Sequence, residues 1–281
     1  MRKIVSMSLA LAAWAGIAAA DVRLPQASPA ASIQQAVGVT DLEITYHRPG
    51  VKGRTIWGGL VPYDQIWRLG ANEATTLAVS SPFRIAGHEI AAGTYALFAI
   101  PGKEAWTFIL DKNPKQWGAF SHKDADDVLR FQAKPQEGPF VERLQFTISP
   151  DTDGAATVEM AWEKLRVAFQ VEVDTAKIVW QGIDAALQKS PDAGAYRTAV
   201  RYALQDNSHQ QEAMGWIDKA IAAGENWSNY DLKAQLLERA GKVKEAIALE
   251  EKALQAAEQA KASSEATDQI KKRLADWKAT H

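Results

Sequence analysis

The 281-residue sequence contains no cysteine. Thiolate nucleophiles, cysteine-ligated zinc, iron–sulfur clusters and disulfide bonds are therefore all excluded. The chain also lacks an excess of positive charge, since 32 Lys and Arg stand against 34 Asp and Glu. Because a polyphosphate backbone is held by a basic surface, we expect no general nucleic-acid binding.

Familiar catalytic motifs are absent as well. The sequence has no Gly-x-Ser-x-Gly elbow, no Gly-x-Gly-x-x-Gly turn and no phosphate-binding loop with Lys. The five histidines, at positions 47, 88, 122, 209 and 281, share no ligand-like spacing, and the acidic run 124–127 is typical of a solvated turn. We therefore predict neither a metal ion nor a cofactor, nominate no catalytic residue and favour a function other than catalysis.

The first twenty residues have the composition of an export signal. Arg2 and Lys3 precede an apolar run over 4–17, and Ala18 and Ala20 supply the small residues of a cleavage site. The apolar run is shorter than the roughly 20 residues that span a bilayer. We expect cleavage after residue 20, a periplasmic or secreted mature chain, and no membrane span in that mature chain.

Residues 39–173 have the two-residue hydrophobic period of β-strands. Alternating runs around 42–46, 77–85, 106–110, 144–148 and 158–162 are separated by turn signals that contain Gly. The longest alternating run comprises Leu165, Val167, Phe169, Val171 and Val173. Eight or so short strands with no helical pattern between them predict an antiparallel β-domain over 21–174. The pattern fits a two-sheet sandwich, which we favour, or a closed barrel.

After Asp174 the hydrophobic period becomes helical, which predicts a helical domain over 175–281. Segment 212–221 aligns with 245–254 at an offset of 33 residues, and four of the ten aligned pairs are identical. This offset is typical of tetratricopeptide repeats, whose unit is about 34 residues, although a generic bundle is the alternative. Helix starts are expected at Ser190-Pro191, at Ser208 with Gln211 and at Ser228 with Asp231, and a helix end at Gly241.

The segment 46–73 is cationic although the domain around it is acidic. It carries four Lys and Arg against two acids, whereas 21–175 holds 15 basic and 19 acidic side chains. Arg binds carboxylate or phosphate in a bidentate manner, and Trp offers a flat stacking face. We predict a site for a small anionic or sugar-like ligand, formed by Arg48, Lys52, Arg54, Trp57, Trp67, Arg68, Asn72 and Glu73. The alternative is that these Arg side chains brace a long loop from within.

The same segment carries long sequence motifs. It reads Tyr46-x-Arg48-Pro49-x-x-Lys52-Gly53-Arg54, then Leu60-Val61-Pro62-Tyr63 and Trp67-Arg68-x-Gly70-Ala71-Asn72, and it is followed by Ala92-Gly93-Thr94-Tyr95 and Trp117-Gly118. Together these motifs, spread over 27–174, resemble the exported bacterial family called Domain of Unknown Function 2911. The resemblance implies export and a tetratricopeptide-like tail, and it implies neither a reaction nor catalytic residues.

Three functions compete on these observations. We favour a binding or scaffolding protein whose strand domain binds the small ligand and whose helical repeats bind a protein partner. The second is a hydrolase of envelope carbohydrate or peptide that uses Glu73, which Arg68 would keep ionised. The third is a purely structural module in which segment 46–73 only braces the fold.

Overall fold

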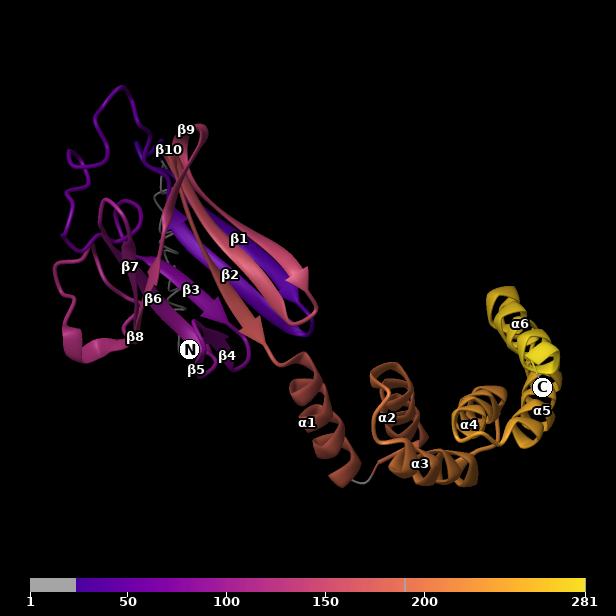
Figure 1. Ribbon diagram of the computed structural model, residues 1–281. Helices are drawn as coiled ribbons and strands as arrows, with labels where there is room; N and C mark the ends of the chain where they lie inside the picture. Colours follow the sequence, from indigo (N-terminus) through magenta and orange to yellow (C-terminus); the bar gives the residue numbers. More distant parts are fainter. Residues whose placement is uncertain (1–23, 190, 281) are drawn as a thin grey trace, which may run out of the picture.

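The computed structural model describes residues 24–189 and 191–280 (Figure 1). The expected export signal, residues 1–20, lies outside this range. The described chain forms a β-rich part followed by six helices, so the predicted two-part architecture is confirmed. Of the helices in the described ranges, none is long and apolar enough to cross a membrane.

Two antiparallel sheets build the β-rich part, and they do not close into a barrel. The larger sheet has the strand order β1-β2-β3-β6-β7-β8, and the smaller has the order β5-β4-β10-β9. The bounds are β1 Ala30–Val37, β2 Thr40–His47, β3 Thr75–Val79, β4 Phe83–Ile85, β5 His88–Ile90, β6 Gly93–Pro101, β7 Trp106–Asp111, β8 Asp127–Ala133, β9 Pro135–Thr152 and β10 Ala155–Val173. The predicted sandwich is confirmed.

The core of the sandwich follows from strand alternation, because successive side chains of a strand point to opposite faces of its sheet. In β2, Leu42 and Ile44 are fully buried, while Asp41 and Thr45 on either side of the pair are exposed and Glu43 between them is half-buried. At Trp162 in β10 the alternation is interrupted by a bulge against β9, so that neighbouring side chains are buried in succession.

Four indoles meet in this core, those of Trp57, Trp67, Trp106 and Trp162. Their contacting ring centroids lie 5.1–6.1 Å apart. Trp106 and Trp162 come from the strands β7 and β10, whereas Trp57 and Trp67 come from the long connection between β2 and β3. The indole cluster therefore fastens this connection to the sandwich.

Six helices form an array in which each packs against the next (Figure 1). Their bounds are α1 Thr175–Gln188, α2 Ala193–Asp206, α3 Gln210–Ala223, α4 Trp227–Arg239, α5 Val243–Gln259 and α6 Ser264–Thr280. α5 begins 33 residues after α3, and α4 begins 34 residues after α2. Ala213 and Ala246, which are aligned by this offset, are both fully buried, so small residues sit where the helices approach closely.

Two helix starts lie elsewhere than the sequence predicted. The Asp192 side chain caps α2 by accepting a hydrogen bond from the N–H of Ala195 (2.8 Å), so Pro191 precedes the helix, and Ser190 lies outside the described residues. Asn226 caps α4 in the same way, so the predicted start at Ser228 is wrong. Asp and Asn are as good caps as Ser, and propensity alone does not rank neighbouring candidates.

The predicted capping box of Ser208 and Gln211 does not form. The Ser208 hydroxyl donates instead to the carboxylate of Asp206 (2.6 Å), and no side chain caps the start of α3. The helix end at Gly241 is confirmed: this residue has a φ of +75°, and its N–H donates to the carbonyl of Glu238 (2.8 Å). A glycine is favoured there because it adopts the left-handed conformation without steric cost.

Candidate ligand-binding site

The guanidinium groups of Arg48 and Arg54 are bonded within the fold. Arg48 Nε donates to the carbonyl of Leu144 in β9 (2.9 Å). Arg54 donates from Nη2 to the carbonyl of Gly50 (2.5 Å) and from Nε to that of Val51 (3.1 Å). Both side chains thereby brace the connection between β2 and β3. This agrees with the alternative prediction that these Arg side chains brace a long loop from within.

The side chains of Trp57 and Trp67 also hold the β2–β3 connection against the sandwich. The rings of both belong to the indole cluster, and Trp67 stacks on Trp162 with an interplanar angle of 18°. Trp67 Nε1 donates to the carbonyl of Gly70 (3.2 Å). Their aromatic faces pack mainly on other indoles, so they present little free surface to a ligand. Lys52, by contrast, is exposed, and it adopts a left-handed backbone with a φ of +49°.

The other three predicted residues lie against the loop that joins β7 to β8. The carbonyl of Asn72 accepts a hydrogen bond from the N–H of Gly118 (3.0 Å), and Glu73 forms a β-bridge with Trp117. Arg68 is half-buried, and burial lowers the pKa of its guanidinium. Its Nε has no hydrogen-bond partner within the described chain. The structure thus joins two segments that are over 40 residues apart in sequence.

A groove of about 470 Å³ lies where these two segments meet. Its floor comes from β2, β3 and the residues before β3, and its far wall comes from the loop after β7. The lining residues are Thr45, Tyr46, His47, Glu73, Ala74, Thr76, Pro114, Lys115, Gln116 and Trp117. Of the eight predicted site residues, Glu73 is the one that lines it.

The groups of this groove that can contact a ligand include the Trp117 indole and a carboxylate–imidazole pair. The Trp117 side chain is 62% exposed, although indoles are among the side chains that gain most from burial. His47 Nδ1 lies 3.4 Å from Glu73 Oε2, and the Glu73 carboxylate remains largely open to solvent. Lys115 adds an exposed ammonium group at the rim. The groove therefore offers one flat apolar face beside hydrogen-bond donors and acceptors.

Comparison with known protein families gives a match, and it covers the β-rich part of the chain. Residues 28–171, just over half of the chain, match the model of a family described as protein of unknown function (DUF2911). The chain belongs to this family. The match ends before α1, so the helices of this DUF2911 protein lie outside it. Among curated proteins and solved structures, no match is found.

Sequence reasoning missed most of the groove of this DUF2911 protein. It selected Glu73 but neither His47 as its partner nor Trp117 and Lys115 from the opposite wall. The available signal was the Trp117-Gly118 motif, which stands in a stretch rich in turn-forming residues. An aromatic side chain in such a stretch is expected to stay at the surface, whereas a tryptophan in a strand can be buried between the sheets.

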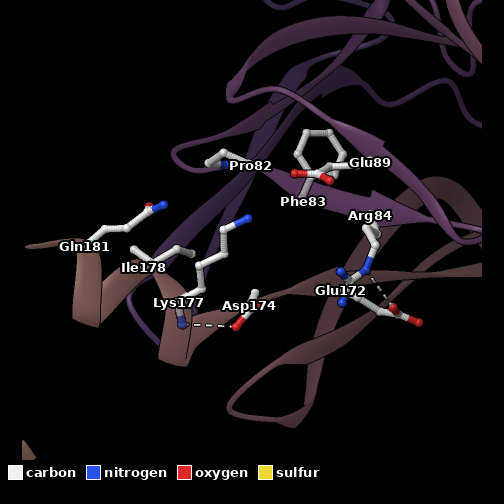
Figure 2. A pocket seen from close by; sticks show the side chains of 9 residues that line it. All are labelled: Pro82, Phe83, Arg84, Glu89, Glu172, Asp174, Lys177, Ile178 and Gln181. Carbon is white, nitrogen blue, oxygen red and sulfur yellow. Dashed lines mark hydrogen bonds and ion pairs between the residues drawn. The ribbon is translucent and has the colours of Figure 1, made fainter. Parts of the chain in front are cut away.

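A second, smaller hollow lies where β10 leads into α1 (Figure 2). It measures about 90 Å³, which leaves room for only a few water molecules. Three of its charged side chains have partners: Arg84 Nε lies 3.6 Å from Glu172, and Asp174 caps α1 by accepting from the N–H of Lys177 (3.0 Å). These contacts hold β10, β4 and α1 together. The larger groove beside Trp117 is therefore the better candidate for a ligand site.

Proposed function

We propose that this DUF2911 protein is an exported binding protein whose β-sandwich binds a carbohydrate in the groove beside Trp117. The observation that carries the proposal is an indole exposed over a groove that also holds the Glu73 carboxylate. Ligand sites combine an aromatic or apolar surface with a few placed polar groups. A sugar ring has an apolar face that fits an indole and hydroxyl groups that bond to carboxylate, imidazole and ammonium groups.

The charges of the groove favour a neutral sugar over an anion. Glu73 contributes a carboxylate and Lys115 one ammonium group, so the lining has no excess of positive charge. Of the three guanidinium groups predicted to hold an anion, those of Arg48 and Arg54 are bonded to carbonyl oxygens, and that of Arg68 does not line the groove. Of the two ligand classes predicted from the sequence, we therefore favour a sugar-like ligand over an anionic one.

Binding is a better account of the groove than hydrolysis. Glycosidases generally use two carboxyl groups, about 5–10 Å apart, on either side of the scissile bond. The residues that line the groove include one carboxylate, that of Glu73. The alternative of a hydrolase that uses Glu73 therefore gains no support from this lining.

A calorimetric titration tests the proposal. The mature chain is titrated with chitotriose, cellotriose and maltotriose, with citrate as the anionic comparison. We expect at least one oligosaccharide to bind, and Trp117→Ala to weaken that binding roughly tenfold because a stacking face worth about 1–2 kcal/mol is lost.

Phe120→Ala is the matched control. Phe120 lies on the same loop and is 86% exposed, but it does not line the groove, so its removal is expected to leave the affinity unchanged. Equal binding by wild type and Trp117→Ala would contradict the proposal, as would heat from citrate alone.

The helical part supports a second role, as a tetratricopeptide-like scaffold for a protein partner. The spacing of α2 to α5 supports this interpretation, as do the buried alanines at equivalent positions. A groove of about 340 Å³ is lined by residues of α2, α4 and α6, including Arg201 and Gln235. Alternate helices that face one groove are what a repeat array presents to a bound segment. Protein binding by this array stays a prediction.

A further inference from the structure

Three side chains with metal-binding atoms meet at one edge of the larger sheet. Asp111 ends β7, Asp127 begins β8, and His122 lies in the loop between them. One carboxylate oxygen of each Asp and a ring nitrogen of His122 all lie within 4.8 Å of one another. His122 Nε2 is 2.7 Å from Asp127 Oδ1 and 4.0 Å from Asp111 Oδ2.

Asp111 holds a buried oxygen without a partner. Its side chain is 0% exposed, and its Oδ1 accepts from the backbone N–H of Asn113 (2.7 Å). Its Oδ2 is buried and has no hydrogen-bond partner within the described chain. Since the nearest ring nitrogen of His122 is beyond hydrogen-bond distance, this carboxylate keeps a desolvated oxygen that faces the imidazole. Such an arrangement is costly unless a cation joins the groups.

The surroundings hold the other two groups in position for a metal ion. The His122 ring packs edge-on against Phe98, with centroids 5.4 Å apart. Arg130 Nε donates to Asp127 Oδ2 (2.6 Å), which leaves Asp127 Oδ1 to face His122. The exposed carboxylate of Asp124 lies 4.0 Å from His122 Nδ1 and also accepts from Arg130. Asp124 thus lies on the side of the ring where metal-bound histidine commonly has a carboxylate partner, at a distance too long for a hydrogen bond.

We propose that Asp111, His122 and Asp127 bind one divalent transition-metal ion, with Zn²⁺ as the best match. Zinc takes nitrogen and carboxylate ligands at about 2.0–2.2 Å, and open zinc sites use three protein ligands and one water molecule. In a tetrahedral site such ligand atoms lie about 3.3 Å apart, between the 2.7 and 4.0 Å separations of this cluster. Two carboxylates and one neutral imidazole also balance the charge of the ion.

The sequence predicted no metal ion because the three ligands have no recognisable spacing. Asp111 and His122 are eleven residues apart, and the acidic run 124–127 suggested a solvated turn. Asp124 is indeed exposed, but Asp127 points inward because it begins a strand that pairs with β7. The ligands are brought together by that strand pairing, which local sequence does not encode.

Zinc binding to the purified mature chain, stripped with a chelator and then dialysed, tests this site. Calorimetry with zinc chloride is expected to give one equivalent per chain, and the ion is expected to raise the melting temperature. Asp111→Asn is expected to reduce the affinity by roughly 100-fold or more, since even outer partners of metal ligands contribute 10–100-fold. His88→Ala, which changes an exposed histidine of β5, is the control and is expected to bind zinc like wild type.

A second variant keeps the test independent of folding defects. His122→Gln removes the nitrogen ligand, and its circular dichroism spectrum is compared with that of wild type before titration. Cobalt(II) added to wild type is expected to give the visible absorption of a four-coordinate ion, and this absorption is expected to be lost in the variant. Failure of wild type to take up zinc would overturn the proposal, as would uptake by Asp111→Asn and His122→Gln that equals the uptake by wild type.

Discussion

Replacement of Trp162 by alanine is expected to lower the free energy of unfolding of the β-sandwich by about 3–5 kcal/mol. The side chain is fully buried on β10 and lies within 6 Å, centroid to centroid, of Trp57 and Trp67. Its removal leaves a cavity and takes away one of the two strand indoles that contact both Trp57 and Trp67, the other being Trp106. Urea unfolding followed by circular dichroism measures the loss through the transition midpoint.

Trp117→Ala is the matched control for this experiment. It removes the same side chain from an exposed position, so its effect on stability is expected to stay within about 0.5 kcal/mol. If Trp162→Ala unfolded at the same urea concentration as wild type, the indole cluster would not be what anchors the connection.

The helical part is expected to lose stability as the pH rises, because of a carboxyl group buried in α5. Glu250 is fully buried, and its Oε1 accepts from Arg273 Nε of α6 (2.9 Å). The pKa of Glu250 is raised to about 8: burial is the largest cause, the nearby charge of Asp231 adds to it, and Arg273 opposes both. Arg273 also donates a hydrogen bond to Asp231, so the one guanidinium group is shared by the carboxyl groups of Glu250 and Asp231.

The direction of the pH effect follows from this raised pKa. The folded chain keeps the proton of Glu250 up to about pH 8, whereas the unfolded chain releases it near pH 4.5. The stabilisation is therefore complete below pH 4.5 and is lost as the pH rises to about 8, at up to about 1.4 kcal/mol per pH unit. We expect a loss on the order of 4 kcal/mol between pH 5 and pH 9, because most of the shift from 4.5 to about 8 falls within this range.

Glu250→Gln removes this titration while keeping an oxygen for Arg273. The variant is expected to match wild type near pH 5 and to be more stable at pH 9, as measured by urea unfolding of the helical signal. Glu251→Gln changes the neighbouring, exposed acid, which pairs with Lys278 at the surface, and is expected to have little effect at either pH. Parallel pH profiles for wild type and Glu250→Gln would contradict the assignment.

The strands and the helices were predictable because their hydrophobic periods are local. Leu42, Ile44 and Tyr46 alternate in the sequence and are buried in β2, and the offset between 212–221 and 245–254 reappears as the spacing of α3 and α5. Helix caps were less predictable, since Asp192 and Asn226 compete with nearby serines and the choice depends on where the first turn packs.

The candidate site was harder to predict because its parts are joined by long-range contacts. The charge pattern of 46–73 does not reveal that Arg48 donates to Leu144, almost a hundred residues away. Nor does it reveal that Trp57 and Trp67 enter the core while Trp117 stays at the surface. Residue types indicated which groups are able to bind a ligand, and strand pairing decided which of them remain free to do so.

We propose that Trp117 recognises the ligand, whereas Trp57 and Trp67 of segment 46–73 hold the fold. Nuclear magnetic resonance tests it directly, through the indole N–H signals assigned by single Trp→Phe variants and followed during titration with the oligosaccharide that binds in calorimetry. We expect the Trp117 signal to shift progressively while the signals of Trp57 and Trp67 stay in place. Shifts of Trp57 or Trp67 with an unmoved Trp117 would contradict it.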